Sequence, residues 1–597
     1  MLNIDEIAEH LKCSTLFKQQ STQQIKNFIA SGRIIELKPD QILFEQGDSS
    51  DAMYLVLSGT LVAYTKTNRA KQQLVIGYLR SGELVGEIGA LGSLPRTLSV
   101  AAKQSAKLLR LETATLFEKL EANPSLFAPI TKLIINRLSN SAAARTGSRF
   151  AKVTLFVANQ HNADLTQFVE RFTAELQQLP IKTIVLQAKD FAQRFPQPPD
   201  DHELMQFINE FTYKYEFVFF CLNQVDSRWF TECVYKAERL VVIVNEGEQV
   251  LTSSLTHLLG QYSQHLRCEL LALQHDNDSQ TSLSRFSTAF PFALYHKVNL
   301  AQPKTIQRLC RFMTGTMRGL VLSGGGFRAW VHVGVIKACV ENGIEIDILG
   351  GTSAGGIVAM AYAKYHDLDQ TIAIIRKCFN VEVEKVKKYT LPIISILDGE
   401  YQTNVLRELF ADIMIEDLAI PCYCVSYNLT RHLQYVHKQG LIWQATRAST
   451  AYPVLVPPML IDGELLVDGG VLNNLPTDVM DQLFMGAGHI MAVDLGEPVG
   501  MRKVINNFPP ILKLWSLLAY KFGVGHQDLR FPSMRDYIFE VMCSGNQQTN
   551  HQNQNYADLL ICPQLEDYSI FTRTDPEELI ARGYQSVVEA LKPTMKQ

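Results

Sequence analysis

The sequence predicts a multidomain protein in which an N-terminal β-roll with flanking helices precedes an α/β accessory domain and a second, larger α/β domain. The chain has 597 residues, which is enough for about three or four domains. Apolar residues make up 47% of it and charged residues 19%, so several cores can be buried. The spacing of apolar residues changes along the chain, which places the domains at 1–140, 150–310 and 316–597.

The first domain is predicted from short alternating strands. Residues 41–66 alternate apolar and polar side chains, with turns at Gly47-Asp48 and Ser58-Gly59. Short strands separated by frequent turns are typical of a β-barrel or β-roll. Two helical segments and a small polar linker are expected after the strands, at 113–121, 125–138 and 139–148.

The second domain alternates apolar strands with helical segments, which indicates a parallel sheet. No glycine-rich phosphate loop follows any of these strands, so we assign no nucleotide to this domain. The expected strands are 153–158, 182–187, 217–222 and 240–244, and the expected helices include 165–176 and 203–211.

The third domain begins with two strand–turn–helix units. The strands 319–322 and 346–349 each lead into a glycine-rich turn, and a helix is expected after each turn, over 327–341 and up to residue 363. The polar stretch 545–555 near the end of the chain is expected to be an exposed loop.

Composition excludes several classes of function. The net charge is −4, so nucleic acid is not expected as a partner. The eleven cysteines are scattered, as expected of reduced thiols, and no further cluster completes a metal site around Cys422 and Cys424. The first residues lack the apolar core of a signal peptide, and no segment reaches the roughly 18 apolar residues of a transmembrane helix. We therefore expect a cytoplasmic or peripheral membrane location.

The first chemical motif is Gly351-Thr352-Ser353-Ala354-Gly355, which fits the pattern G-x-S-x-G. This spacing suits a serine on a sharp turn from strand to helix, where small neighbours let the chain turn without a clash. The helix N-terminus then points free N–H groups at a developing anion. A structural tight turn is the alternative interpretation.

The second motif is the glycine loop Gly324-Gly325-Gly326, which is followed by Phe327 and Arg328. Successive glycines leave backbone N–H groups unobstructed, as an oxyanion hole requires. A phosphate-binding loop is the rival interpretation, but neither G-x-G-x-x-G nor G-K-[ST] is present. Arg328 can either hold this loop or add positive potential for a phosphate-bearing substrate.

The third motif is Asp468-Gly469-Gly470, at the end of the apolar run 465–467. A carboxylate held in a tight turn can accept the proton of a serine directly. The alternative is a turn-forming aspartate, which is common in Asp-Gly pairs.

Together, these three motifs resemble the patatin-like phospholipases, which use G-G-G-x-R, G-x-S-x-G and D-G-G for a Ser–Asp dyad without a histidine. The resemblance is closer to the neuropathy target esterase branch and covers about residues 150–597. It rests further on Asp347, on the stretch 448–458 and on the N-N-L-P that follows the third motif. One departure is Phe327, where alanine is more usual, and it can narrow the site or pack beneath it.

The resemblance implies hydrolysis of a phospholipid or lysophospholipid ester, with Ser353 as nucleophile and Asp468 as base. It also implies an oxyanion hole from residues 324–326, and no metal or other cofactor for catalysis. A Ser–His–Asp triad is the mechanistic rival, for which His489 and His332 are the candidates. Both histidines stand in apolar sequence surroundings and are interpreted as structural.

Residues 40–110 resemble the cyclic nucleotide-binding β-roll. The segment from Gly86 and Glu87 to Arg96 and Thr97 carries the resemblance, with the glutamate and arginine nine residues apart. The family uses this glutamate for the ribose hydroxyl and this arginine for the cyclic phosphate. The resemblance implies a regulatory ligand, cAMP or cGMP. The hydroxyl of Thr97 does not decide between the two.

A lipid substrate requires a membrane-facing surface. The segment 508–522 is apolar with a tryptophan, a tyrosine and two lysines, so it is a candidate for an interfacial helix, and a core or lid helix is the alternative. We also consider a second hypothesis for the whole chain: a cyclic-nucleotide-responsive binding protein with an inactive hydrolase fold.

Overall fold

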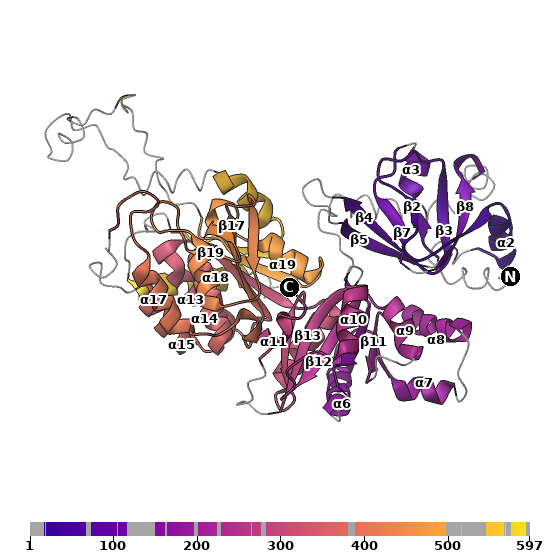
Figure 1. Ribbon diagram of the computed structural model, residues 1–597, viewed down its shortest axis with the longest axis horizontal. Helices are drawn as coiled ribbons and strands as arrows, with labels where there is room; N and C mark the ends of the chain where they lie inside the picture. The colour runs from indigo at the N-terminus through magenta and orange to yellow at the C-terminus, as the bar shows by residue number, and fades with distance from the viewer. Residues whose placement is uncertain are drawn as a thin grey trace.

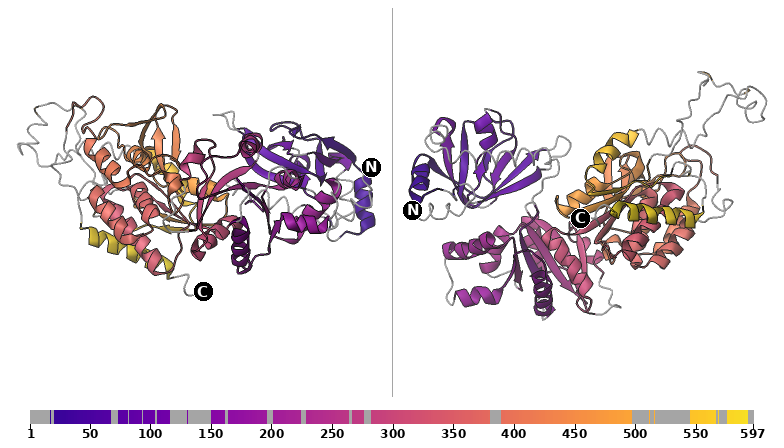
Figure 2. Two further views of the ribbon diagram at one scale, coloured as in Figure 1. Left: turned by 60° about the horizontal axis from the view of Figure 1, so that its bottom comes forward. Right: turned by 180° about the vertical axis from the view of Figure 1, so that it is seen from behind.

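A computed structural model of the chain shows three lobes, and the magenta middle lobe borders the other two in every view (Figures 1 and 2). One hydrogen bond between lobes runs from the ammonium of Lys103 in the β-roll to the carbonyl of Ala237, at 2.7 Å. The described residues, apart from isolated positions, are 20–66, 73–80, 82–115, 150–160, 164–195, 201–223, 228–263, 266–275, 282–379, 389–496, 545–565 and 575–592.

The first lobe is a β-roll of two four-stranded antiparallel sheets, in the orders β1-β8-β3-β6 and β2-β7-β4-β5. The turn between β3 and β4 contains Gly59, whose φ is +91° and whose missing side chain would lie 2.5 Å from the carbonyl oxygen of Ser105. Only glycine fits this turn without strain. The elements are α2 (Thr22–Ala30), β1 (Arg33–Leu37), β2 (Ile42–Phe44), β3 (Ala52–Ser58), β4 (Thr60–Lys66), β5 (Gln73–Arg80), β6 (Leu84–Val85), α3 (Glu87–Gly92), β7 (Ser99–Ala102) and β8 (Ala106–Glu112).

The second lobe is a six-stranded parallel sheet in the order β10-β11-β9-β12-β13-β14, with helices packed on it. Its central strands β9 and β12 are buried except at Asn245, the last residue of β12, as continuous apolar runs require. The elements are β9 (Val153–Ala158), α6 (Asp164–Gln177), β10 (Thr183–Gln187), α7 (Ala188–Arg194), α8 (Asp201–Lys214), β11 (Phe217–Leu222), α9 (Arg228–Lys236), β12 (Arg239–Asn245), α10 (Ser253–Tyr262), β13 (Arg267–Gln274), α11 (Ser284–Ser287), β14 (Tyr295–Asn299) and α12 (Pro303–Thr314).

The third lobe is an eight-stranded mixed sheet in the order β19-β20-β17-β16-β15-β21-β22, with β18 paired to β17. Its core strands β17, β16, β15, β21 and β22 are parallel, so their carboxyl ends meet at one edge. The elements are β15 (Arg318–Leu322), α13 (Trp330–Glu341), β16 (Ile348–Thr352), α14 (Ser353–Tyr365), α15 (Leu368–Phe379), α17 (Glu400–Phe410), β17 (Cys422–Asn428), β18 (Leu433–His437), α18 (Ile442–Ser449), β19 (Met459–Ile461), β20 (Glu464–Asp468), α19 (Thr477–Phe484), β21 (His489–Val493), β22 (Leu559–Ile561) and α22 (Pro576–Leu591).

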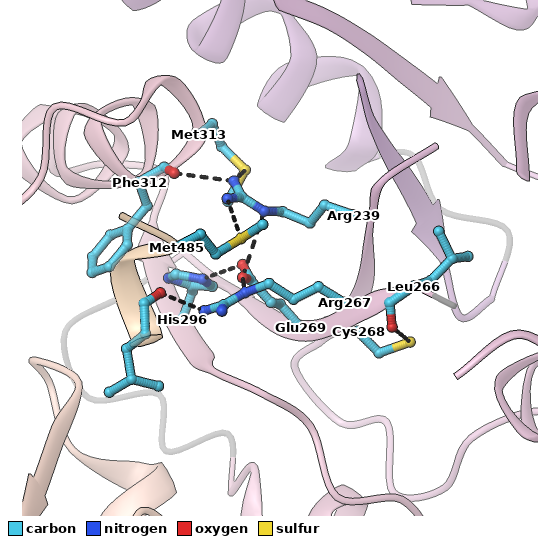
Figure 3. Close-up of polar contacts among 10 residues, drawn as sticks. Arg239, Leu266, Arg267, Cys268, Glu269, His296, Phe312, Met313 and Met485 are labelled. Carbon is cyan, nitrogen blue, oxygen red and sulfur yellow. Dashed lines mark hydrogen bonds and ion pairs between the residues drawn. The ribbon is translucent and has the colours of Figure 1, made fainter. Parts of the chain in front are cut away.

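A buried charge cluster of the second lobe contacts the third lobe and is drawn in Figure 3. Oε1 of Glu269 forms an ion pair with Arg267 and lies 3.5 Å from the guanidinium of Arg239. Oε2 of Glu269 lies 3.0 Å from Nε2 of His296. Burial alone would raise the pKa of Glu269, but the two guanidinium groups outweigh it and lower this pKa well below its usual range.

The cluster joins the accessory sheet to the end of α19. Arg267 donates a hydrogen bond of 2.8 Å to the carbonyl of Leu483, and Arg239 lies 3.8 Å from the sulfur of Met485. Arg239 also donates to the carbonyl of Phe312 on α12. Apolar side chains from both lobes form one continuous core around this contact.

Several sequence expectations can now be compared with the fold. The β-roll followed by two α/β regions is confirmed, and the predicted strands 153–158 and 217–222 have the same bounds in the structure. Strands β13 and β14 were not predicted. The predictions for 139–148 and for most of 125–138 and 508–522 lie outside the described residues.

The expectation of an exposed loop at 545–555 is wrong, because residues 545–554 are helical and Asn546 and Asn553 are buried. The misleading signal was polarity, since these asparagines find hydrogen-bond partners inside the protein. In the described part of the chain, no helix has the length and apolar character needed to cross a membrane.

Candidate active site

Ser353 lies on a sharp turn between β16 and α14. Its φ is +52°, in the left-handed region that non-glycine residues rarely adopt. The turn brings the first residues of α14 against the end of β15, where a side chain at Gly355 would lie 2.3 Å from the carbonyl oxygen of Leu322. The glycine of the G-x-S-x-G pattern is therefore required by close packing, and the strained serine stands at the carboxyl edge of the sheet.

Asp468 stands opposite this serine, at the end of β20. The hydroxyl of Ser353 donates a hydrogen bond of 2.7 Å to Oδ2 of Asp468. Strand β20 pairs antiparallel with β17, and the backbone N–H of Asp468 donates to the carbonyl of Ala451 at 3.0 Å. Two sheet strands thus fix the carboxylate against the hydroxyl, although the two residues are 115 positions apart.

The environment of Asp468 tunes its basicity. Burial raises the pKa of Asp468 to about 6, although hydrogen bonds from the N–H of Gly470 and from the hydroxyl of Ser353 oppose this effect. A carboxylate with this pKa is ionised near neutral pH and is a stronger base than an exposed aspartate. The pair is therefore suited to direct transfer of the serine proton.

The glycine loop lies beside the nucleophile. A side chain at Gly324 would come 3.2 Å from Cβ of Ser353 and 2.4 Å from the side-chain oxygen of Asn474. The N–H of Gly324 donates to the carbonyl of Asn474 at 3.2 Å, so this amide is engaged. The expectation that all three glycine amides of the loop face an oxyanion is therefore corrected for Gly324. The amides of Gly325 and Gly326 have no acceptor among the described residues.

Arg328 and Phe327, which follow the glycine loop, anchor it to neighbouring segments. Arg328 is buried and donates to the carbonyl of Gly496 at 3.1 Å, which fits the interpretation that it holds the loop. The ring of Phe327 packs edge-to-face against Phe379 of α15, with 6.0 Å between the ring centres.

The partner of the serine hydroxyl is Asp468, and the two candidate histidines make other contacts. His489 is exposed and begins β21 opposite Arg318, at the amino edge of the sheet, whereas Ser353 follows the carboxyl edge. His332 is buried on α13, with its Nε2 2.8 Å from the carbonyl of Ser323, and burial lowers its pKa to about 4. This arrangement favours the dyad over a triad.

The helix at 545–554 supplies residues that sequence reasoning missed. Asn546 donates to the carbonyl of Gly470, and the side-chain oxygen of Asn550 accepts from the N–H of Asn474 at 3.1 Å. Asn553 donates to the side-chain oxygen of Asn473 at 2.9 Å.

These three asparagines stand at positions i, i+4 and i+7, so they share one helix face. That helical spacing was the feature of the sequence that could have indicated a helix here. The helix holds the loop that carries the base, and we call it the asparagine helix below.

Two further motifs have structural roles. Asp347 is buried and accepts three hydrogen bonds from Arg311, at 2.6 to 3.1 Å, so it joins α12 to the central sheet. Cys422 and Cys424 pack into the same core, and burial raises the pKa of both thiols. Among the described residues there is no cluster of ligands that could hold a metal ion.

In the β-roll, the side chain of Arg96 is buried and donates hydrogen bonds to backbone carbonyls of the β-roll. Its guanidinium donates to the carbonyl of Ala52 at 2.7 Å and to that of Gly86 at 3.0 Å. It also stacks over the ring of Phe44 at 4.2 Å and lies 3.9 Å from Asp51. Its Nε is buried without an acceptor in the described residues.

The other predicted nucleotide-site residues surround this arginine. Gly86 has a φ of +77°, and a side chain there would lie 2.1 Å from the guanidinium, so glycine is required. Glu87 begins α3 and is buried, whereas Thr97 is exposed. The structure therefore brings Arg96 against Gly86 at the start of α3, with Glu87 close enough to influence its charge.

The sequence matches two protein families. Residues 320–481 match the family described as patatin-like phospholipase, and residues 34–123 match the cyclic nucleotide-binding domain. The chain thus combines a patatin-like phospholipase domain with an N-terminal cyclic nucleotide-binding domain.

Its curated relatives belong to the neuropathy target esterase branch, as the motifs indicated. Neuropathy target esterase sws of Drosophila melanogaster is 25% identical over 93% of this chain and 42% of its own length. Human patatin-like phospholipase domain-containing protein 6 is 27% identical over 83% of this chain and 40% of its own length. Lysophospholipase NTE1 of Candida albicans is 25% identical over 80% of this chain and 40% of its own length. The chain thus spans less than half the length of these three relatives.

Proposed function

We propose that the chain is a serine lipid acyl hydrolase, a phospholipase or lysophospholipase, with Ser353 and Asp468 as its catalytic dyad. The observation that carries the proposal is the 2.7 Å hydrogen bond from the serine hydroxyl to a buried carboxylate. The match to the patatin-like phospholipase family supports the substrate class, and one relative is named a lysophospholipase.

In the acylation step, Oδ2 of Asp468 takes the proton of Ser353 while Oγ attacks the carbonyl carbon of the ester. The negative charge that develops on the carbonyl oxygen is stabilised by the amides of Gly325 and Gly326. The intermediate then breaks the ester bond and releases the alcohol, which takes the proton back from Asp468.

In the deacylation step, Asp468 removes a proton from water, and the resulting nucleophile attacks the acyl-serine. The second tetrahedral intermediate releases a fatty acid and restores the serine hydroxyl. No metal or cofactor takes part in this sequence.

We further propose that cAMP or cGMP binds the β-roll and changes turnover at Ser353. Arg96 would take the cyclic phosphate, Glu87 would accept a hydrogen bond from the ribose, and Gly86 and Thr97 would line the turn. The presence of the arginine and the match to the cyclic nucleotide-binding domain support this ligand class.

The test is phospholipid and lysophospholipid turnover by the purified chain, titrated with cAMP and with cGMP. The proposal predicts release of fatty acid and a nucleotide-dependent rate. Full activity in both Ser353→Ala and Asp468→Asn would contradict the dyad. A chain that binds nucleotide but neither hydrolyses lipid nor reacts with a fluorophosphonate would instead be a binding protein with an inactive hydrolase fold.

A further inference from the structure

An exposed apolar loop projects from the catalytic lobe ahead of α17. Residues 389–394, with the sequence Y-T-L-P-I-I, are all exposed and carry no charge, and we call them the apolar tip. Its four large side chains are exposed by 67% at Tyr389, 73% at Leu391, 80% at Ile393 and 68% at Ile394. Four large apolar side chains within six residues form a patch of the kind that marks an interaction site.

The apolar tip has a fixed base. The N–H of Thr390 donates to the carbonyl of Ile396 at 3.0 Å, which closes the loop on itself. Ile396 and Leu397 then donate to the carbonyls of Val454 and Leu455, at 2.8 and 2.9 Å. The tip is therefore held out toward solvent by backbone hydrogen bonds at its base.

The segment that holds the tip also contacts the catalytic base. Residues 450–458 link α18 to β19, and we call them the strap. The carbonyl of Ala451 in the strap accepts from the N–H of Asp468 at 3.0 Å. Ser449, which directly precedes the strap, accepts from the N–H of Ser353 at 2.9 Å. The tip and the dyad are thus attached to one short stretch of chain.

Arg447 fastens the base of this assembly. It is buried, and its guanidinium donates to the carbonyl of Pro457 in the strap at 3.0 Å and to the hydroxyl of Thr403 at 3.1 Å. A side chain at Gly399, the residue that precedes α17, would lie 2.7 Å from the same guanidinium. One cation therefore joins the strap to the start of α17, which follows the tip in the chain.

We propose that the apolar tip is a lipid-contact element, which inserts into a membrane surface and places the strap and the dyad at the interface. The proposal rests on the proposed function, because it supplies the route by which a lipid ester reaches Ser353. An acyl chain that passes along apolar side chains avoids exposure to water between the bilayer and the site.

A lipid surface fits the tip better than a protein partner does. A stable protein interface buries about 800 Å² on each partner and involves about 20–30 residues a side, which a loop of six residues does not provide. Insertion into a bilayer requires only a few apolar side chains, each contributing the free energy of leaving water. The absence of charge in the tip also favours hydrocarbon over a polar protein surface.

The test is flotation of the full chain with phosphatidylcholine vesicles, using I393D/I394D. The matched control is V250D/V340D, which places two charges at exposed apolar positions outside the tip. We expect I393D/I394D to lower the vesicle partition coefficient about tenfold or more, since two isoleucines no longer leave water. We expect V250D/V340D to lie within about twofold of the wild type.

The two variants also separate lipid contact from catalysis. Hydrolysis of vesicle lipid is expected to fall with the partition coefficient in I393D/I394D, while hydrolysis of a soluble short-chain ester stays near the wild-type rate. Unchanged vesicle binding in I393D/I394D would overturn the proposal, and so would a change in oligomeric state by sedimentation, which would assign the tip to a second copy. Flotation of Ser353→Ala keeps the test independent of catalysis, since its binding is expected to match the wild type even if no ester is hydrolysed.

Discussion

In the catalytic lobe, Ser353 begins α14 directly after strand β16, and in the β-roll, Glu87 begins α3 one residue after strand β6. Both junctions contain a residue with positive φ, Ser353 at +52° and Gly86 at +77°. Both therefore use a sharp turn from strand to helix to aim a polar group.

The two sites beside these junctions differ in what their key side chain, Ser353 or Arg96, already binds. The hydroxyl of Ser353 is bonded to its base, so the reactive pair is formed before a substrate arrives. The guanidinium of Arg96 is instead bonded to two backbone carbonyls. The Nε of Arg96 has no acceptor among the described residues, so under the proposed function a donor remains for a cyclic phosphate, whereas the catalytic pair is already complete.

The largest expected effect is the loss of either dyad member. We expect Ser353→Ala and Asp468→Asn to lower turnover of a soluble ester by a factor on the order of 10⁴, because neither proton transfer nor acylation can then proceed. Initial rates at saturating substrate measure this, with thermal unfolding as the folding control. A loss below tenfold in either folded variant would show that the pair is not the reactive centre.

The next largest effect is expected on nucleotide binding by Arg96 in the β-roll. Arg96→Ala is expected to weaken cAMP or cGMP binding about a hundredfold, because a charged hydrogen-bond donor to the phosphate is removed. Calorimetry on the full chain measures it, and Arg96→Lys is the matched variant that keeps charge without the fork geometry. Equal affinity in wild type and Arg96→Ala would exclude this arginine from the nucleotide site.

A smaller effect is expected in the asparagine helix. Asn553 donates to the side-chain oxygen of Asn473, to the carbonyl of Leu475 and to Asp478, at 2.9 to 3.1 Å. Asn553→Ala removes the donor to Asn473 and Leu475 and loosens the loop after Asp468, so we expect kcat to fall about tenfold. Asn555→Ala, on the same helix end but without these contacts, is the control. Wild-type kcat in Asn553→Ala would mean that the helix does not position the base.

The smallest effect concerns stability. Burial raises the pKa of Asp468 to about 6, so the folded chain holds this proton more tightly than the unfolded chain does. Ionisation therefore costs stability above about pH 6, and the cost disappears as the pH falls toward the usual aspartate value. We expect Asp468→Asn to raise the Tm by a few degrees at pH 7.5 and by less at pH 4.5. A lower Tm at pH 7.5 would contradict the burial of an ionised carboxylate.

Local motifs made the elements around the dyad predictable. Three glycine-rich turns after apolar strands, together with the family resemblance that they carry, predicted Ser353, Asp468 and the loop at 324–326 as parts of one site. The sequence could not reveal that the amide of Gly324 is engaged, because its acceptor, Asn474, is 150 positions away along the chain. Long-range hydrogen bonds of this kind depend on the packed fold.

Polar segments were harder to predict than apolar ones. The stretch 545–555 has a composition typical of loops, yet three of its asparagines bond to the segment 470–474. Nothing in the sequence indicates that Ile393 and Ile394 are exposed, because isoleucine is usually a core residue. Residue type predicts burial on average. Hydrogen bonding buries the asparagines, and a projecting loop exposes the isoleucines, against that average.

The most direct test of the Ser–Asp dyad is the rate at which a fluorophosphonate labels Ser353 as a function of pH. A Ser–Asp dyad predicts a labelling rate that follows one ionisation near pH 6, falls about tenfold per pH unit below it, and is lost in Asp468→Asn. A labelling rate in Asp468→Asn that equals the wild-type rate, or label on a residue other than Ser353, would contradict it.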